Sequence, residues 1–495
     1  MYPTIENIKE IAAKGQCKRV PVCREVYADR YTPVEVMRTL RKASRHCYLL
    51  ESASQTEVWG RYSFLGYEPA MEITCTDGAM KIRRTEGEDQ GEITKQVAHP
   101  GDTLREILKE YKSPVIEDMP PFTGGLVGYF SYDYIKYSEP TLKLDAEDQE
   151  HFKDVDLMLF DKVIAYDNYR QKIVLMINIE TENLEENYEK AVQELEKMEE
   201  LIRFGKPAET KDGHLKSEFR PLFDEKAYCE KVEQVKHYIH EGDLFQLVLS
   251  NRLEADFEGS LLDTYRVLRT TNPSPYMFYF SSDDVEIAGA SPETLVKVED
   301  GEVRTFPLAG TRPRGKSYEE DQRLEKELLA DEKERAEHNM LVDLGRNDLG
   351  KICDFGTVEV EKYMSIERYS HVMHIGSTVK GQLRKDKTAV DAIDSVLPAG
   401  TLSGAPKLRA CQIINELENN KRGIYGGAIG YLDFTGNMDT CIAIRLAFKK
   451  NGKVFVRSGA GIVADSIPEK EHQECINKAK AVMVALAEAE GGSNL

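Results

Sequence analysis

Short apolar runs separated by turn-forming residues dominate the first two hundred positions, and they predict a region rich in β-strands. The runs are enriched in β-branched and aromatic residues, which favour a pleated, half-buried backbone. A helix is expected over residues 182–202, because apolar side chains recur there at three- and four-residue steps between charged ones. The expected strands cover residues 46–52, 71–75, 125–130, 162–167 and 172–178.

Strands and helices follow one another irregularly in the rest of the chain. Several strands occur in succession, which favours an α+β fold with antiparallel sheets over a doubly wound parallel sheet. A polar stretch with Gly and Pro, residues 204–220, suggests a division into regions 1–210 and 220–495, which can still share one composite core. Helices are expected over 224–241, 318–344 and 468–489, and strands over 245–253, 276–280, 303–306, 428–432, 441–448 and 454–457.

Composition and charge narrow the classes of function. The 495 residues are 41% hydrophobic and 31% charged, which is ordinary for a globular protein with a sizeable core. The formal net charge of −20 argues against nucleic acid and anionic membrane surfaces as main partners. Apolar runs such as 173–177 are too short to span a bilayer, and the charged N-terminal segment is not expected to act as a signal peptide. Nine scattered cysteines without a CxxC pair indicate a reduced, cytoplasmic protein.

Two pairs of carboxylates stand three residues apart on predicted helices. Glu334 and Glu337 belong to one helix, and Glu471 and Glu474 to the other, so each pair lies on one side of its helix. If the helices faced each other, four anions would repel unless a cation lay among them, and a site with only oxygen ligands suits Mg²⁺. The same spacing is common on the solvated helices of acidic proteins, so the pattern alone also fits an exposed surface.

Four glycine-rich segments in the C-terminal region predict a binding site for an anion. Loops of this kind bring backbone N–H groups, and sometimes a helix N-terminus, close to a carboxylate or phosphate. The last segment contains GxGxxA, but the next helix begins only near Pro468, so a dinucleotide-binding turn is disfavoured. The four segments cover residues 307–315, 397–407, 423–431 and 458–466.

His371 and His374 form a candidate pair in a segment predicted to be extended. Positions three apart in a strand face opposite sides, so the two rings cannot easily bind one ion. One histidine acting as a proton donor or acceptor is the favoured hypothesis, and an ordinary polar role fits the spacing equally well.

Several long motifs are specific enough to indicate a family. They are NPSPYMFYF, PLAGTRPRG, DEKERAEHNMLVDLGRNDLG, YSHVMH, AGTLSGAPK, GIYGGAIGY and GAGIVADSIPEKEHQE. Together they resemble the chorismate-utilising enzymes, and among these most closely the large subunits of anthranilate synthases. The resemblance runs through most of the chain and is densest over 224–486. It implies an α+β fold of two packed antiparallel β-sheets, an orthogonal sandwich with helices on the outside.

The resemblance also implies an activity and a cofactor. Enzymes of this kind convert chorismate and ammonia to anthranilate and pyruvate, the first committed step of tryptophan synthesis. The implied metal is Mg²⁺, which takes the ring carboxylate of chorismate. Glu337 and Glu474 match the direct ligands, and Glu334 and Glu471 lie beside them, either as ligands or through water.

Catalytic and substrate-binding residues follow from the same resemblance. Glu293 matches the candidate acid for loss of the C4 hydroxyl, and His374 matches the residue implicated in removing the C2 proton. Thr401 lies near the same pocket. The residues implied to contact substrate are Gly310, Thr311, Tyr425, Arg445 and the backbone of Gly459, Ala460 and Gly461.

Two positions distinguish this chain from related enzymes. Family members that add water, such as isochorismate and salicylate synthases, have a lysine where Gln246 stands here. Component I of aminodeoxychorismate synthase typically has a lysine where Ala309 stands. These enzymes remain the alternatives within the family. A non-catalytic, ligand-binding regulator on the same scaffold is the alternative from another class, which the intact carboxylates disfavour.

A partner subunit and an inhibitor are expected as well. No cysteine stands in a GxCxG nucleophile motif, so a separate glutamine amidotransferase subunit is expected to supply ammonia in a heterodimer or heterotetramer. The resemblance implies feedback inhibition by L-tryptophan at a site apart from the catalytic pocket. The expected contacts are Glu51, Ser52, Pro275, Tyr276 and Met277. The alternative is a strand packed against a proline-rich turn.

Overall fold

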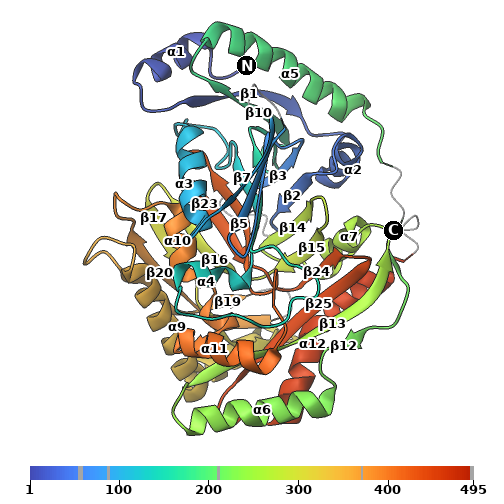
Figure 1. Cartoon of the computed structure of the whole chain (residues 1–495), viewed down its shortest axis with the longest axis vertical. Helices are drawn as coiled ribbons and strands as arrows, with labels where there is room; N and C mark the ends of the chain where they lie inside the picture. Colours follow the sequence, from blue (N-terminus) through green and yellow to red (C-terminus); the bar gives the residue numbers. More distant parts are fainter. Residues whose placement is uncertain (54–59, 86–89, 209–211, 369–371, 491–495) are drawn as a thin grey trace.

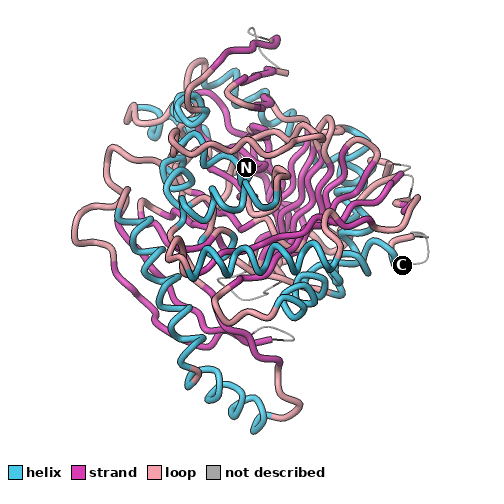
Figure 2. The backbone as a smooth tube through the Cα atoms, turned by 60° about the horizontal axis from the view of Figure 1, so that its bottom comes forward, coloured by secondary structure: helices cyan, strands magenta, loops and turns pink. Residues whose placement is uncertain are grey.

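Two large antiparallel β-sheets with helices around them form the protein. The computed structural model describes residues 1–53, 60–85, 90–208, 212–368 and 372–490. Within these ranges, sheet A has 13 strands and sheet B has 12, paired antiparallel. The predicted α+β fold is therefore confirmed, and Figure 2 shows the helices around the outside of the strands.

Figure 1 labels the elements in chain order. The helices are α1 (Ile5–Ala13), α2 (Pro33–Ala43), α3 (Pro100–Glu110), α4 (Ile135–Ser138), α5 (Leu184–Phe204), α6 (Glu225–His240), α7 (Leu262–Thr271), α8 (Tyr318–Ala330), α9 (Glu332–Gly350), α10 (Ala389–Val396), α11 (Lys407–Glu418) and α12 (Pro468–Glu488), with 3₁₀ turns at Tyr132–Tyr134 and Gly400–Leu402. Sheet A runs in the order β1 (Arg19–Tyr27), β10 (Lys172–Glu180), β9 (Lys162–Asp167), β3 (Tyr62–Tyr67), β2 (Cys47–Glu51), β14 (Tyr276–Ser281), β15 (Glu286–Ser291), β24 (Leu446–Lys450), β25 (Lys453–Ile462), β13 (Gln246–Glu258) and β11 (His214–Leu215), and β12 (Arg220–Pro221) and β21 (Gly404–Ala405) also pair with β13. Sheet B runs β18 (Leu308–Pro313), β20 (Val372–Gln382), β17 (Glu302–Thr305), β16 (Thr294–Glu299), β23 (Met438–Ile442), β22 (Ala428–Asp433), β7 (Gly125–Phe130), β8 (Val155–Phe160), β4 (Met71–Thr76), β5 (Ala79–Arg84) and β6 (Gly91–Gln96), and β19 (Glu359–Arg368) also pairs with β20.

Both sheets combine strands from the two regions that the sequence suggested. In sheet A, β2 pairs with β14, and Glu51 lies opposite Met277. In sheet B, β7 pairs with β22, and Gly128 lies opposite Gly430. Strands from either side of the polar linker therefore form continuous sheets. The suggested boundary at residue 210 lies outside the described residues.

Apolar side chains fill the space between the sheets and the space under the outer helices. Phe280 of β14 and Tyr129 of β7 meet between the sheets with ring centroids 6.4 Å apart. Leu40 of α2 and Leu195 of α5 belong to the core that covers sheet A, and Ile393 of α10 belongs to the core against sheet B. Burial of these faces is the main contribution to stability. Among the described helices, none is both long enough and apolar enough to cross a membrane.

A two-residue crossing links the sheets after β15. This strand of sheet A ends at Ser291, and β16 of sheet B begins at Thr294. The register between β16 and β23 shifts just after Thr294, so the backbone is irregular where it enters sheet B. Glu293 lies on this crossing, which removes its side chain from the regular alternation of a strand.

A second crossing divides the strand that was expected over 441–448. β23 of sheet B ends at Ile442, whereas β24 belongs to sheet A. Arg445 lies between them with a left-handed backbone, at a φ of 53°, and this turn redirects the chain. The Ile442 N–H donates to the Glu293 carbonyl oxygen at 3.0 Å, so the two crossings lie against each other.

The single helix expected over 318–344 is two helices, α8 and α9, separated by Asp331. The backbone of Asp331 is extended, with φ −71° and ψ 108°. Its carboxylate accepts hydrogen bonds from the backbone N–H groups of Lys333 and Glu334 and so caps α9. The apolar spacing continues through this point, but the acidic cap starts a new helix.

Two of the glycine-rich segments expected as loops are largely strand. Residues 308–313 form β18, and 453–462 form β25, which pairs with β13 along most of its length. A Cβ atom at Gly459 would lie 2.7 Å from the Leu249 carbonyl oxygen of β13. The glycine at position 459 allows the two strands to approach closely. The sequence alone does not distinguish a glycine in this role from a glycine in a turn.

Candidate active site

Glu293 has a carboxyl group in a cavity of about 50 Å³ between the crossing and the turn before α11. Thr401 Oγ1 donates a hydrogen bond to Glu293 Oε1 at 3.0 Å. Burial raises the pKa of Glu293 to about 7, although Thr401 and the nearby Lys478 both act to lower it. A carboxyl group with this pKa holds a proton near neutral pH and can donate it.

His374 lies on β20 opposite Thr311 of β18. Gly310 forms a bulge there with a φ of 66°, a left-handed conformation that favours glycine. The His374 Nδ1–H donates to the Gly310 carbonyl oxygen at 2.9 Å, so Nε2 carries the lone pair. Burial lowers the pKa of His374, and the charges of Arg445 and Lys478 lower it further, which keeps the ring neutral. His371, the other histidine of the candidate pair, lies outside the described residues.

The first carboxylate pair projects from α9 toward β18 and β13. A Cβ atom on Gly310 would lie 3.0 Å from Glu334 Oε2, so the glycine gives this carboxylate room. Arg312 Nη1 lies 3.3 Å from Glu334 Oε1. Gln246 Nε2 donates to Glu337 Oε1 at 2.8 Å. Gln246, the position expected to distinguish this chain from water-adding enzymes, thus contacts an expected metal ligand.

The second pair lies on α12 near the start of α9. Burial raises the pKa of Glu471, and the charge of Glu474 raises it further. The charge of Lys333 of α9 acts in the opposite direction and lowers the pKa of Glu471. Lys478 forms an ion pair with Glu474, with N and O atoms 2.7 Å apart.

The donor set of these two pairs fits a hard divalent cation. All four groups are carboxylates, and the pKa of the first glutamate in each pair is raised by burial and then by its neighbour's charge. The four do not form a closed ligand shell. Among the described residues, one tight cluster of metal-ligating groups is found, His46, Glu72 and Asp283, and it includes none of these four glutamates. Arg83 pairs with both of its carboxylates.

The expected substrate-binding residues line the meeting point of the two sheets. Tyr425 is buried, and Arg422 lies over its ring at 5.8 Å. Arg445 is half-buried and forms no ion pair with any carboxylate in the described part of the chain. Its charge is therefore available to an anion. Gly459 and Gly461 lie on β25, and a Cβ atom at Gly461 would lie 2.7 Å from the side chain of Gln246.

Lys478 is the site residue that the sequence reasoning missed. Its Nζ donates to the Gly459 carbonyl oxygen at 3.1 Å. Its charge also acts on Glu293 and His374, which places the ammonium group among the candidate catalytic side chains. The sequence contains a signal that could have identified this lysine. Lys478 lies four residues after Glu474, and therefore on the same face of α12.

Comparison with known proteins identifies the family. The profile of chorismate binding enzymes matches residues 45–484. Anthranilate synthase component 1 of Acetivibrio thermocellus is 45% identical over 497 residues, which cover 99% of both chains. The chain belongs to the anthranilate synthase component 1 family. A crystal structure of anthranilate synthase component I from Streptococcus pneumoniae is 40% identical, covers 86% of this chain and 92% of that one, and superposes with a TM-score of 0.75. The menaquinone-specific isochorismate synthase of Escherichia coli shares the fold, with a TM-score of 0.68 at 20% identity, and the match covers 97% of this chain and 99% of that one.

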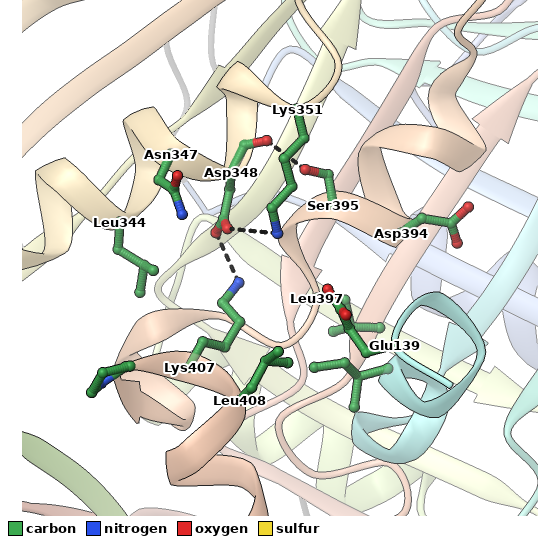
Figure 3. A pocket seen from close by; sticks show the side chains of 12 residues that line it. Glu139, Leu344, Asn347, Asp348, Lys351, Asp394, Ser395, Leu397, Lys407 and Leu408 are labelled. Carbon is green, nitrogen blue, oxygen red and sulfur yellow. Dashed lines mark hydrogen bonds and ion pairs between the residues drawn. The ribbon is translucent and has the colours of Figure 1, made fainter. Parts of the chain in front are cut away.

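This anthranilate synthase component 1 family member also has a cavity of about 420 Å³. Figure 3 shows the side chains that line it. The two cavities share Leu344 and Asp348 as lining residues. Lys407 Nζ donates to Asp348 Oδ2 at 2.8 Å, and Ser395 donates to the Asp348 carbonyl oxygen. The polar groups of the larger cavity therefore largely bind one another, which favours a structural role.

The segments expected to bind tryptophan lie together at the joint between β2 and β14. Met277 is buried, whereas Ser52, Pro275 and Tyr276 are partly exposed. The backbone N–H of Ala53 donates to the Ser274 carbonyl oxygen at 3.0 Å, which extends the pairing beyond the strand ends.

Glu51 is held by an internal network at this joint. Its carboxylate accepts hydrogen bonds from the Tyr265 hydroxyl at 2.5 Å, from Arg269 Nε at 3.0 Å and from Ser63 at 3.2 Å. A buried carboxylate with these partners is a structural anchor of the strand. Its neighbours Ser52 and Pro275 present the more accessible surface.

Proposed function

We propose that this chain converts chorismate and ammonia to anthranilate and pyruvate. The observation that carries the proposal is the Glu293 carboxyl group, whose pKa is about 7, on a crossing that lies against Arg445. Membership of the anthranilate synthase component 1 family supports the choice of substrate.

The first chemical step needs an acid. The ammonia nitrogen bonds to ring C2, the double bonds shift, and the C4–O bond breaks. Hydroxide is a poor leaving group, so Glu293 transfers its proton to that oxygen and water departs. The new ammonium group on C2 loses a proton to solvent, and Glu293 takes up a proton again before the next turnover. Thr401 orients the carboxyl group through its 3.0 Å hydrogen bond.

The second step needs a base. His374 Nε2 takes the proton from C2, the electrons form the aromatic ring, and the ether C–O bond at C3 breaks. Enolpyruvate leaves and takes up a proton to become pyruvate. The Nδ1–H bond to the Gly310 carbonyl oxygen holds the ring in the tautomer that this role requires.

Substrate orientation rests on charge. Arg445, which lies near Tyr425, binds the enolpyruvyl carboxylate together with the backbone of Gly459 to Gly461. Glu337 and Glu474, with Glu334 and Glu471 beside them, would hold Mg²⁺. That ion, when bound, neutralises and orients the ring carboxylate. Gln246 keeps Glu337 in position through its 2.8 Å hydrogen bond.

We also assign the partner and the regulation to this function. A glutamine amidotransferase subunit supplies ammonia in a hetero-oligomer, and L-tryptophan inhibits at the β2–β14 joint. The nine cysteines are all free, and seven of them are buried, which supports a reducing, cytoplasmic setting.

Anthranilate fluorescence tests the proposal directly. The purified chain, mixed with chorismate, Mg²⁺ and an ammonium salt, is expected to form the fluorescent product. Formation of isochorismate or of aminodeoxychorismate without anthranilate would favour one of the related enzymes. Binding of chorismate without any turnover would favour a non-catalytic regulator.

A further inference from the structure

The backbone of Tyr276 is fixed against the strand that leads into the Glu293 crossing. Tyr276 is the first residue of β14, and it lies directly opposite Ser291, the last residue of β15. The chain leaves sheet A immediately after this pair. Tyr276 therefore stands beside the point at which the crossing begins.

The side chain of the same tyrosine contacts the strand on which the crossing ends. The Tyr276 hydroxyl donates to Asp439 Oδ1 of β23 at 2.8 Å, and it lies 2.9 Å from Thr294 Oγ1 of β16. A tyrosine hydroxyl has one hydrogen, so its oxygen accepts from Thr294 while it donates to Asp439. Both partners belong to sheet B.

One residue of sheet A thus contacts both ends of a two-residue link, Ser291 through its backbone and Thr294 through its hydroxyl. Sheet B acts on the same link through Ile442, whose N–H donates to the Glu293 carbonyl oxygen and whose carbonyl accepts from Ser291 Oγ at 2.7 Å. We propose that the Tyr276 hydroxyl is a positioning group, which holds the crossing so that the Glu293 carboxyl group meets Thr401 and the substrate.

This inference rests on the acid role of Glu293 in the proposed function and adds a residue to it. Tyr276 acts through the backbone of the crossing and does not touch the reacting atoms. Displacement of a catalytic group by about 1 Å can cost on the order of 100-fold in rate, so a tether at this point has a measurable effect. The tether also connects β14 to the crossing through Thr294, the residue after Glu293, so a ligand that moves β14 would act on the acid.

Tyr276→Phe tests the tether, because it removes the hydroxyl and keeps the ring. Activity is measured on the full chain with Mg²⁺ and saturating ammonium, in the absence of tryptophan. We expect kcat to fall about tenfold, with the KM for chorismate changed less than about twofold. Tyr129→Phe is the matched control, because the buried Tyr129 hydroxyl has no hydrogen-bond partner among the described residues. It is expected to keep the wild-type kcat.

Two variants of Thr294 provide an independent check. Thr294→Val removes the hydroxyl and is expected to lower kcat as Tyr276→Phe does, whereas Thr294→Ser keeps it and is expected to retain most of the activity. The double variant Tyr276→Phe with Thr294→Val should be no worse than Tyr276→Phe alone, because the Tyr276–Thr294 contact that Thr294→Val breaks is already lost in Tyr276→Phe.

The results separate this inference from the proposed function. If Tyr276→Phe keeps the wild-type kcat while Glu293→Gln is inactive, the tether is overturned and the proposed function is not. An active Glu293→Gln enzyme overturns both. If Tyr276→Phe does not fold, equal kcat values for Thr294→Val and Thr294→Ser overturn the tether.

Discussion

The Thr401 hydroxyl donates a hydrogen bond of 3.0 Å to the carboxyl group of Glu293, 108 positions earlier in the chain. This contact joins the turn before α11 to the crossing between the two sheets. It also opposes burial, because a hydrogen bond to the ionised form lowers the pKa that burial raises. Burial and this contact therefore act together on the pH range in which the carboxyl group can act as an acid.

Glu293→Gln is expected to lower kcat by at least about 100-fold, because a general acid contributes roughly 10²–10⁴. In the wild type, a pKa of about 7 means that the proton is held below this pH and lost above it. At constant free ammonia, the rate should fall about tenfold per pH unit on the basic side. Thr401→Val removes a contact that lowers the pKa, so the falling limb should move to higher pH. An unmoved limb would contradict the assignment.

Thermal melting provides the control for that experiment. The pKa of Glu293 is raised in the folded state from the ordinary 4.5 to about 7. Ionising the group therefore takes stability away as the pH rises through about 7. Glu293→Gln should melt at or above the wild-type temperature at pH 8, so that lost activity cannot be attributed to unfolding.

Glu337→Gln is expected to abolish turnover and the response to Mg²⁺. Added Mg²⁺ should raise the melting temperature of the wild type, because binding to the folded state stabilises it, and should not raise that of the variant. Glu332→Gln, exposed on the same helix, is the control and should respond as the wild type does. Full activity in excess EDTA would disprove the requirement for a metal.

The purified chain should form anthranilate from ammonium salts and not from glutamine. Neutral ammonia is the nucleophile, so the ammonia-dependent rate at fixed total ammonium should rise with pH until Glu293 loses its proton. A family amidotransferase subunit added to the chain should restore the use of glutamine. Glutamine-dependent product from the chain alone would refute the need for a partner.

Ala309→Lys is expected to reduce anthranilate formation by at least about tenfold. Ala309 is 9% exposed on β18, next to Gly310 and opposite Ile375. An amine at this position would lie near the ring and compete as a nucleophile. Ala309→Met adds a side chain of similar length without the amine. It therefore separates the effect of the amine from the effect of side-chain size. Equal activity of the two variants would exclude the amine as the cause.

Met277→Thr and Ser52→Ala should weaken inhibition by tryptophan. Both positions lie at the β2–β14 joint, where the two regions of the chain meet. An inhibitor must bind the less active state more tightly, and loss of about 1–3 kcal/mol of coupling raises the half-inhibitory concentration roughly 5- to 150-fold. Unchanged sensitivity in both variants, or displacement of chorismate by tryptophan, would rule out a separate site there.

The sequence by itself determined the elements and the chemistry that they carry. The strand at 172–178 and the helix at 182–202 follow from local periodicity, and both are present with slightly shifted ends. The i, i+3 spacing placed Glu334 beside Glu337 without any tertiary information, because the period of an α-helix is fixed by its hydrogen bonds. The break between α8 and α9 at Asp331 was not predicted, because the apolar spacing continues through this residue. The Asp331 cap nevertheless starts a new helix there.

Only the tertiary structure decided where these groups meet. Nothing local in the strand expected over 441–448 reveals that the chain changes sheets at Arg445, since that turn depends on pairing with strands far away in the sequence. The same holds for Glu293, whose pKa is set by burial and by the distant Thr401 and Lys478. The local sequence specifies the periodicity of the elements and the residues that can cap them. Burial and long-range strand pairing exist only in the folded chain, and it is burial that raises the pKa of Glu293 and long-range pairing that positions the crossing.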